Sequence, residues 1–390
     1  MPADHLRTKV VTQSIENYGP DEAKAIADEN DCSFLHLINP EPDHQFLRGS
    51  RQELIFKKIA ENIEGFIEEG ILVKEALPSI YIYKVTHDGL VQTGIWTLTQ
   101  ISDYLEGGIK RHESTVEKRE ILLRDYLQQT GLDANPVLMT YPPYETIDTI
   151  IEKYTKLDPR LDLTFTDGGK HQIWAISNEQ DLNTITAEFH SMSSVYIADG
   201  HHRAASMARM HPQVQHFTTV YMNTREIKIL EFNRLVKDLD GLDPMTFIFS
   251  LSNSFLMEKS AVPVKPTKLH QIGMYFNGQW YLLCPKKAMY DEQDPVSVLD
   301  VSILQNFILS PILNIRDPRT NPRISFEGGR IPITSLQNKV DNGAFAIAFT
   351  LFPPSAAQII AVADANGIMP PKSTWVEPKF LVGLITNYFN

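Results

Sequence analysis

Apolar residues recur along the chain at two spacings, and each spacing predicts a different kind of element. Over residues 51–73 they return every three or four positions, which is the period of an amphipathic helix. Over residues 80–101 apolar and polar residues alternate on both sides of Asp88-Gly89, which is typical of a β-hairpin because Asp-Gly fits its tight turn. Helices and hairpins are therefore mixed from the start of the chain.

The rest of the chain continues this mixture. Helices are expected over 19–30, 112–131, 148–157, 244–253, 299–313 and 355–367. Strands are expected over 33–43 (a short strand running into a loop), 135–143, 214–224, 226–236 and 343–354, and hairpins over 162–177 and 268–285. The strands at 214–224 and 226–236 are expected to be neighbours.

This order of elements predicts an α+β fold. At 390 residues the chain is long enough for two domains. We place a catalytic core at 1–240 and a C-terminal α+β portion at 241–390, with a soft boundary near residues 238–243.

Composition and charge narrow the class of protein. The formal net charge is −12, and no long run of Lys or Arg is present, which argues against a nucleic-acid partner. Cys32 and Cys284 are the only cysteines and have no metal-ligand spacing, so a reducing compartment is expected. The N-terminus lacks the apolar segment of a secretory signal, and no stretch is apolar enough to span a membrane. We therefore expect a cytoplasmic protein.

The strongest chemical signal lies at residues 194–211, where an apolar strand pattern ends in Asp199-Gly200-His201-His202-Arg203 and a helix pattern follows. Gly200 permits a tight turn, and a helix that begins there points unpaired N–H groups at a bound anion. Arg203 can bind phosphate, His201 and His202 can donate protons, and Asp199 suits a metal ligand or a base. Two alternatives stay open: Asp199 is only a helix cap, or the histidines bind zinc.

A second charged cluster lies at residues 110–120. Glu113 is a candidate general base for a substrate hydroxyl, with Arg111 and Arg119 as phosphate contacts. The alternative is structural, because Ser114 and Glu117 have the spacing of a capping box at a helix start.

Two further candidates lie later in the chain. Lys372, Ser373 and Thr374 follow two prolines and present an ammonium and two hydroxyl groups to phosphate or carboxylate, although the glycine pattern of a P-loop is absent. Arg234 lies among apolar strand residues. It is either buried with an acid or an anionic ligand, or it lies on an edge strand with a solvated head.

Four segments together resemble a known family: YIADGHHR, RHESTVEKR, LDVSILQNFILSPIL and MPPKSTWVEPKFLVGLI. From about Ser14 to Asn390 the chain resembles the domain of unknown function 1015 family. That family is related to the ParB/sulfiredoxin-like superfamily and to free-serine kinases. The resemblance implies a ParB/sulfiredoxin-like core and a role for the Asp-Gly-His-His-Arg residues in handling a phosphoryl group and a metal.

The resemblance and the residues together predict a phosphotransferase. It would move a phosphoryl group between ATP or ADP and the hydroxyl of a small amino acid, free L-serine to or from O-phosphoserine, with Mg²⁺ held by Asp199. His202, Arg203 and Gly200 would bind the phosphoryl group, and Lys372, Ser373 and Thr374 the nucleotide. The alternative is a ParB-like regulator that binds CTP without turnover. A homodimer is left open.

Overall fold

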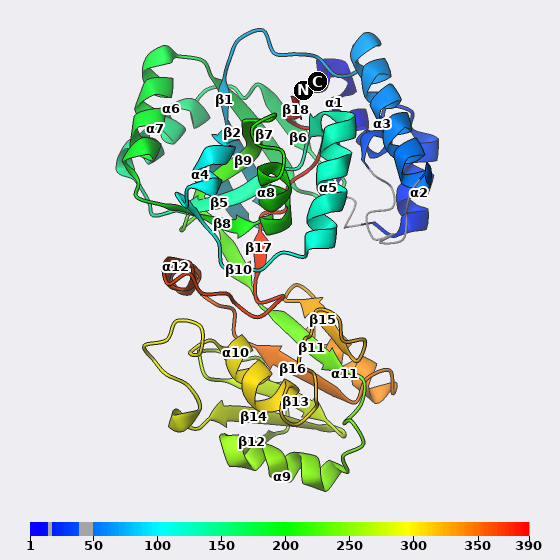
Figure 1. Ribbon diagram of the computed structural model, residues 1–390, viewed down its shortest axis with the longest axis vertical. Helices are drawn as coiled ribbons and strands as arrows, with labels where there is room; N and C mark the ends of the chain where they lie inside the picture. Colours follow the sequence, from blue (N-terminus) through cyan, green and yellow to red (C-terminus); the bar gives the residue numbers. More distant parts are fainter. Residues whose placement is uncertain (15–17, 39–49, 390) are drawn as a thin grey trace. The chain divides into compact units, whose positions relative to one another are not determined.

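The computed structural model describes residues 1–14, 18–38 and 50–389. The chain forms two compact units (Figure 1). Unit 1 comprises Met1–Lys110, Thr115–Ile227 and Pro378–Asn390, and unit 2 comprises Arg111–Ser114 and Lys228–Glu377.

Unit 1 is built on an eight-stranded mixed sheet in the order β3-β8-β5-β9-β2-β1-β7-β6. Its strands are β1 (Ile80–His87), β2 (Leu90–Gln100), β3 (Ile109–Lys110), β5 (Val137–Tyr141), β6 (Leu161–Thr164), β7 (Lys170–Ile176), β8 (Val195–Asp199) and β9 (His216–Asn223). The short strands β4 (Leu132–Asp133) and β18 (Asn387–Tyr388) pair with each other. The β3–β8 and β5–β9 pairs are parallel, so this sheet is not a simple series of hairpins.

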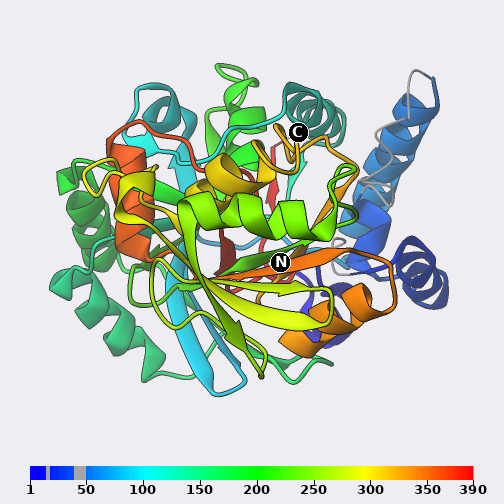
Figure 2. The same ribbon diagram turned by 90° about the horizontal axis from the view of Figure 1, so that it is seen from below.

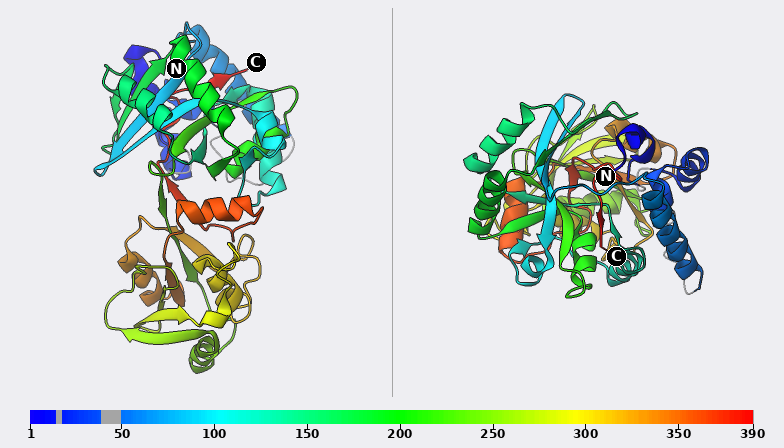
Figure 3. Two further views of the ribbon diagram at one scale, coloured as in Figure 1. Left: turned by 90° about the vertical axis from the view of Figure 1, so that its left-hand side faces the viewer. Right: turned by 90° about the horizontal axis from the view of Figure 1, so that it is seen from above.

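Helices surround this sheet and complete its core. They are η1 (Asp4–Leu6), α1 (Arg7–Val10), α2 (Pro20–Glu29), η3 (Phe34–Leu37), α3 (Ser50–Glu68), α4 (Ile101–Leu105), α5 (Glu117–Thr130), α6 (Glu145–Thr155), α7 (Glu179–Ser191) and α8 (His201–Ala208). Figure 3 shows α6 and α7 together at one end of unit 1, with α2 and α3 at the other. The apolar faces of α6, α7 and α8 pack with the sheet in one buried cluster.

Unit 2 is built on a six-stranded sheet in the order β12-β14-β13-β16-β11-β15, in which every pair is antiparallel. Its strands are β10 (Lys228–Leu230), β11 (Phe232–Val236), β12 (Phe255–Ser260), β13 (Ile272–Phe276), β14 (Gln279–Pro285), β15 (Ile324–Gly328), β16 (Ile347–Leu351) and β17 (Trp375–Glu377), of which β10 and β17 form a separate pair. Its helices are α9 (Pro244–Ser254), η4 (Lys287–Met289), α10 (Asp300–Leu304), η5 (Gln305–Leu309, a π-helix), α11 (Ile333–Asp341) and α12 (Ala356–Asp364).

Both faces of the sheet in unit 2 are covered. Figure 2 shows α9 and α10 on one side of the sheet and α11 on the other, and a separate apolar cluster lies on each side. The central strands β11, β13 and β16 are buried along their whole length, which explains their continuous apolar runs.

Most predicted elements are confirmed, including the α+β class. The hairpin turns at Asp88-Gly89 and Asn277-Gly278 have both residues at positive φ, as the tightest hairpin turn requires. The strand predicted at 33–38 is wrong, because Phe34–Leu37 forms a 3-10 helix with three buried side chains; residues 39–43 of that prediction lie outside the described residues.

The strands at 214–224 and 226–236 are not neighbours, so that prediction is wrong. β9 lies in the sheet of unit 1, whereas β11 pairs with β15 and β16 of unit 2. The division of the chain after residue 240 stays a prediction; the compact units change over at several points of the chain, among them Ile227–Lys228 and Glu377–Pro378. The last residues return to unit 1, where β18 pairs with β4.

Candidate functional site

The Asp-Gly-His-His-Arg residues form a turn between β8 and α8, which we call the β8–α8 turn (Asp199–Arg203). Asp199 ends the buried strand β8, and Gly200 precedes α8 with φ of 100°, a conformation that other residues rarely adopt. Figure 1 shows α8 beside α5, against which it packs. The predicted strand, turn and helix are therefore confirmed, and the first N–H groups of α8 lie at the turn.

Arg203 folds back across Gly200. A Cβ atom at position 200 would lie 2.9 Å from Nη2 of Arg203, so the guanidinium occupies the space that a side chain would take. Its Nη1 donates to the carbonyl oxygen and side-chain oxygen of Asn135, at 3.2 and 2.7 Å, and to the carbonyl of Pro136. Nη2 donates to Asp199 at 3.2 Å. Arg203 is thus fixed by the loop before β5, which limits its freedom to follow a phosphate.

Asp199 lies between two cations. Besides Arg203, the Nζ of Lys379 lies 3.3 Å from Oδ2 of Asp199. Burial alone would raise the pKa of Asp199, but the attraction of Lys379 and Arg203 outweighs it and lowers the pKa to about 2. The carboxylate therefore stays ionised near neutral pH and is a poor general base there.

The two histidines of the turn differ in environment. His201 is buried, and its charge interaction with Asp199 also lowers the pKa of that carboxyl. His202 is half-buried, and the backbone N–H of Val116 points at its Nδ1 over 3.5 Å. Because Val116 precedes the first residue of α5, His202 stands at the N-terminal end of that helix. An Nδ1 atom that accepts this N–H leaves the ring proton on Nε2.

The start of α5 differs from the predicted capping box. The helix begins at Glu117, Val116 is its N-cap, and no side chain caps it, so the predicted pairing of Ser114 with Glu117 is wrong. A tertiary contact lies there instead: Glu120 accepts a hydrogen bond from Arg209, the residue that follows α8, at 2.7 Å. Arg119, a predicted cofactor contact, is exposed on α5.

The remaining predicted residues belong to unit 2. Arg111 and Glu113 lie in the short segment Arg111–Ser114. This segment contacts the end of unit 2, because the N–H of Met369 donates to the carbonyl of His112 at 2.8 Å. Glu113 and the loop that carries Lys372 are therefore brought near each other within unit 2, although more than 250 residues separate them in the sequence.

The loop with Lys372, Ser373 and Thr374 has a fixed internal structure. Lys372 has φ of 55°, and its ammonium lies 5.3 Å from the centre of the Phe232 ring, within the range of a cation–π contact. Ser373 is buried and donates its hydroxyl to Pro370 O at 2.5 Å. Ser373 therefore shapes the loop, whereas Lys372 is exposed and Thr374 half-buried.

Arg234 is bonded to the loop that carries Lys372. It lies on β11, an interior strand, so the edge-strand alternative is wrong. Only 2% of Arg234 is exposed, and it donates to the carbonyl oxygens of Phe232 and Lys372. Within the described residues no carboxylate pairs with it, and burial lowers its pKa to about 9. A buried cation whose partners are carbonyl groups and the ring of Phe326, 5.5 Å away, retains its attraction for an anion.

The described residues do not form a metal centre. Among them, no group of three or more His, Cys, Asp or Glu side chains is arranged to hold a metal ion. Asp199, the predicted Mg²⁺ ligand, has two cations beside it, and a divalent ion would have to compete with both. The residues around Asp199 do not fit a resident magnesium site.

The site residues are thus divided between the two units. Asp199, Gly200, His201, His202, Arg203 and Arg119 belong to unit 1, and Arg111, Glu113, Arg234, Lys372, Ser373 and Thr374 belong to unit 2. That Asp199 and Lys372 line one cleft stays a prediction.

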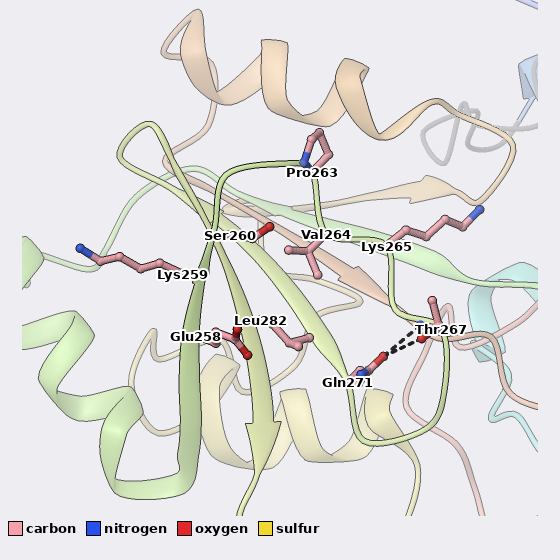
Figure 4. A pocket seen from close by; sticks show the side chains of 9 residues that line it. All are labelled: Glu258, Lys259, Ser260, Pro263, Val264, Lys265, Thr267, Gln271 and Leu282. Carbon is pink, nitrogen blue, oxygen red and sulfur yellow. Dashed lines mark hydrogen bonds between the residues drawn. The ribbon is translucent and has the colours of Figure 1, made fainter.

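A surface hollow in unit 2 contains none of these residues. It measures about 310 Å³ and lies beside β12 and β14 (Figure 4). The side chains of Lys259 and Lys265 point away from it, and Thr267 donates to Gln271 at 3.0 and 3.1 Å from its backbone and hydroxyl. We do not place the functional site there.

The structure defines an α+β protein in which a charged, preorganised turn leads from a strand into a helix. The chain belongs to the family described as "Protein of unknown function (DUF1015)", whose model matches residues 1–302. The family resemblance drawn from the sequence is therefore confirmed. None of the described helices has the length and apolar character needed to cross a membrane.

Several solved structures are similar to the chain at 11% identity. A free serine kinase in complex with AMP has a TM-score of 0.40, with 73% of this chain and 88% of that chain covered. A conserved hypothetical protein from Pyrococcus furiosus has a TM-score of 0.39, with coverages of 73% and 91%. SbnI with a C-terminal truncation, from Staphylococcus aureus, has a TM-score of 0.40, with coverages of 75% and 85%. No curated protein matches the sequence.

Proposed function

We propose that this protein is a phosphotransferase that moves a phosphoryl group between ATP or ADP and the hydroxyl of a small amino acid, L-serine or, in reverse, O-phosphoserine. The observation that carries the proposal is the β8–α8 turn, in which Arg203 is fixed over Gly200 beside the first N–H groups of α8. Phosphoryl transfer depends mainly on positioning and on electrostatic stabilisation by groups that are already in place. The four sequence segments resemble a family that is related to free-serine kinases, and this supports the choice of substrate.

Each residue of the turn has a proposed role. The N–H groups at the start of α8 bind phosphoryl oxygens, with His201 and His202 beside them. Arg203 is a positioning residue, because its Nη1 is occupied by Asn135 and Pro136. Asp199 holds the neighbouring cations in place, since its low pKa keeps it ionised.

The residues of unit 2 are proposed to act on the hydroxyl and the nucleotide. Glu113 would accept the hydroxyl proton while the substrate oxygen forms a bond to the terminal phosphorus. The bond from that phosphorus to the bridging oxygen breaks, and ADP leaves when ATP is the donor, or AMP when ADP is. Lys372 and Thr374 would bind nucleotide phosphates, with Arg111 nearby and with Ser373 and Arg234 shaping the loop.

No step of this proposal passes through a metal ion held by the protein. The surroundings of Asp199 do not fit one. Nucleotide phosphates usually carry Mg²⁺ with them, so the assay below includes it.

The test is direct measurement of product. Purified protein is mixed with L-serine, MgCl₂ and either ATP or ADP, and O-phosphoserine is detected by phosphorus NMR. The reverse reaction is followed from O-phosphoserine with ADP or AMP. We expect turnover in the native protein and a fall of about 100-fold or more in Asp199→Asn, because loss of its charge removes the ion pair that positions Lys379 and one of the contacts that position Arg203.

Asp181→Asn is the matched control. Asp181 also lies in unit 1 and accepts from Lys153 at 2.7 Å, but it is on α7, away from the β8–α8 turn. Turnover in this control should stay within about threefold of the native rate. Absence of turnover in both directions, together with binding of CTP, would reject the kinase and favour the CTP-binding regulator.

A further inference from the structure

Lys379 is a charged residue beside the β8–α8 turn. From the sequence alone it is either a further phosphate contact or an ordinary surface charge. Its Nζ lies 3.3 Å from Oδ2 of Asp199, and 36% of its side chain is exposed. It thus combines an ion pair in the turn with access to solvent. An exposed lysine beside the start of a helix that has no acidic residue in its first turn adds positive charge where an anion would bind.

The backbone on both sides fixes the position of Lys379. The next residue, Phe380, is buried, and its ring lies 5.7 Å from that of Tyr83 and 5.8 Å from that of Trp96. Three residues after Lys379, Val382 exchanges two backbone hydrogen bonds with Thr12, at 2.9 and 3.2 Å. The Cα of Lys379 is therefore held beside Asp199, while the four-carbon side chain retains its freedom.

Arg203 and Lys379 differ in how they are held, although both contact Asp199. Arg203 donates to two residues of the loop before β5 in addition to Asp199. Lys379 carries a compact charge on a flexible stem and can exchange one anion for another without moving the backbone. Of these two cations, Lys379 is the one suited to moving from the carboxylate to a phosphate.

We propose that Lys379 is a phosphate-binding residue of the β8–α8 turn: it pairs with Asp199 when the site is empty and contacts the phosphoryl oxygens of a bound nucleotide. This inference rests on the proposed function for the identity of its ligand. The role is catalytic in the sense that its charge opposes the negative charge of the transferred group.

The test compares binding and turnover in Lys379→Met, Lys379→Arg and the control Lys156→Met. Lys156 is an exposed lysine at the end of α6 in unit 1. Binding of ADP, pyrophosphate and adenosine is measured by isothermal titration calorimetry, and phosphoryl transfer by the O-phosphoserine assay. Circular dichroism with thermal unfolding checks the fold of each variant.

We expect Lys379→Met to weaken ADP and pyrophosphate binding at least tenfold, with adenosine unchanged because it has no phosphate. Turnover should fall about 100-fold, a usual effect of removing one charge-stabilising donor. Lys379→Arg should recover part of the phosphate binding and part of the turnover. Lys156→Met should behave as the native protein.

The outcomes separate this inference from the proposed function. If the native protein binds ADP through Lys379 but forms no O-phosphoserine, the phosphate contact stands and the proposed reaction fails. If O-phosphoserine forms and Lys379→Met binds and turns over within threefold of native, the reaction stands and the inference is overturned. If Lys379→Met has a lower unfolding temperature but unchanged ADP binding, Lys379 stabilises the fold and does not bind phosphate, and the inference is overturned. A native protein that binds neither ADP nor pyrophosphate overturns both the inference and the proposed function.

Discussion

At the scale of single residues, the β8–α8 turn shows how sequence chemistry and three-dimensional contacts combine. Glycine is required at position 200 for two reasons. Its φ of 100° disfavours any side chain, and the guanidinium of Arg203 lies where a Cβ atom would be. The second requirement is invisible in the sequence, because it depends on Arg203 turning back toward Asn135.

Gly200→Ala tests both requirements together. We expect the free energy of unfolding to fall by about 1–3 kcal/mol from backbone strain, and ADP binding to weaken because Arg203 is displaced. Urea unfolding and calorimetric titration measure the two effects. Gly168→Ala is the control, since Gly168 has φ of 83° and nothing within 4 Å of its Cβ position. It should lose a similar amount of stability and bind ADP normally; equal ADP binding in both variants contradicts the account of Arg203.

At the scale of elements, the start of α10 contains a buried acid with half of its hydrogen bonding unsatisfied. Oδ1 of Asp300 accepts the N–H of His270 at 2.9 Å, whereas Oδ2 has no partner among the described residues. Burial raises the pKa of Asp300 to about 7, although the bond from His270 acts to lower it. The folded state therefore keeps a proton that the unfolded chain loses near pH 4.

This shift predicts a pH dependence of stability in unit 2. A raised carboxyl pKa contributes stability at low pH, and that contribution is lost as pH rises from about 4 to about 7. The slope approaches about 1.4 kcal/mol per pH unit for one proton. Asp300→Asn should remove this part of the slope between pH 5 and pH 7 in urea unfolding, while the exposed Glu292→Gln should not. A native slope that survives in Asp300→Asn would show that other groups cause it.

Element prediction succeeded where local chemistry decides and failed where it does not. The turns at Asp88-Gly89 and Asn277-Gly278 adopt the expected conformation because few other residues tolerate it. The segment Phe34–Leu37 was expected to be a strand, yet it forms a 3-10 helix whose apolar side chains enter a core shared with α3. A short apolar run has no period of its own, so tertiary packing decides its conformation.

At the scale of the whole molecule, the chain has two units with separate cores. Leu138 of β5 lies in the sheet of unit 1 and Leu251 of α9 in the core of unit 2, and both are fully buried. Because each unit has a buried core of its own, we expect two cooperative unfolding transitions in calorimetry.

Leu138→Ala and Leu251→Ala assign the transitions. Each removes a buried side chain at a cost of about 2–5 kcal/mol, and each should lower the temperature of a different transition. A single transition that both variants lower equally would contradict independent cores.

The site was predicted in part at this scale. The residues of the β8–α8 turn could be predicted from the sequence, because a strand that ends in Asp-Gly and is followed by charged helical residues is typical of an anion-binding turn. For Lys379 the sequence left two interpretations open, a phosphate contact or a surface charge, and it did not show the link to Asp199, which spans 180 residues. A single lysine after a proline carries no local sign of such a contact.

The sequence by itself determined the local conformations and the chemical types available: the hairpin turns, the amphipathic helices, and the strand–glycine–helix junction with its charged residues. These follow from backbone sterics and from the spacing of apolar residues, which act over a few positions. Only the tertiary structure decided which charges meet, that Arg203 is fixed by carbonyl groups and that Lys379 pairs with Asp199. Those contacts depend on how distant segments pack, and packing is a property of the folded chain as a whole.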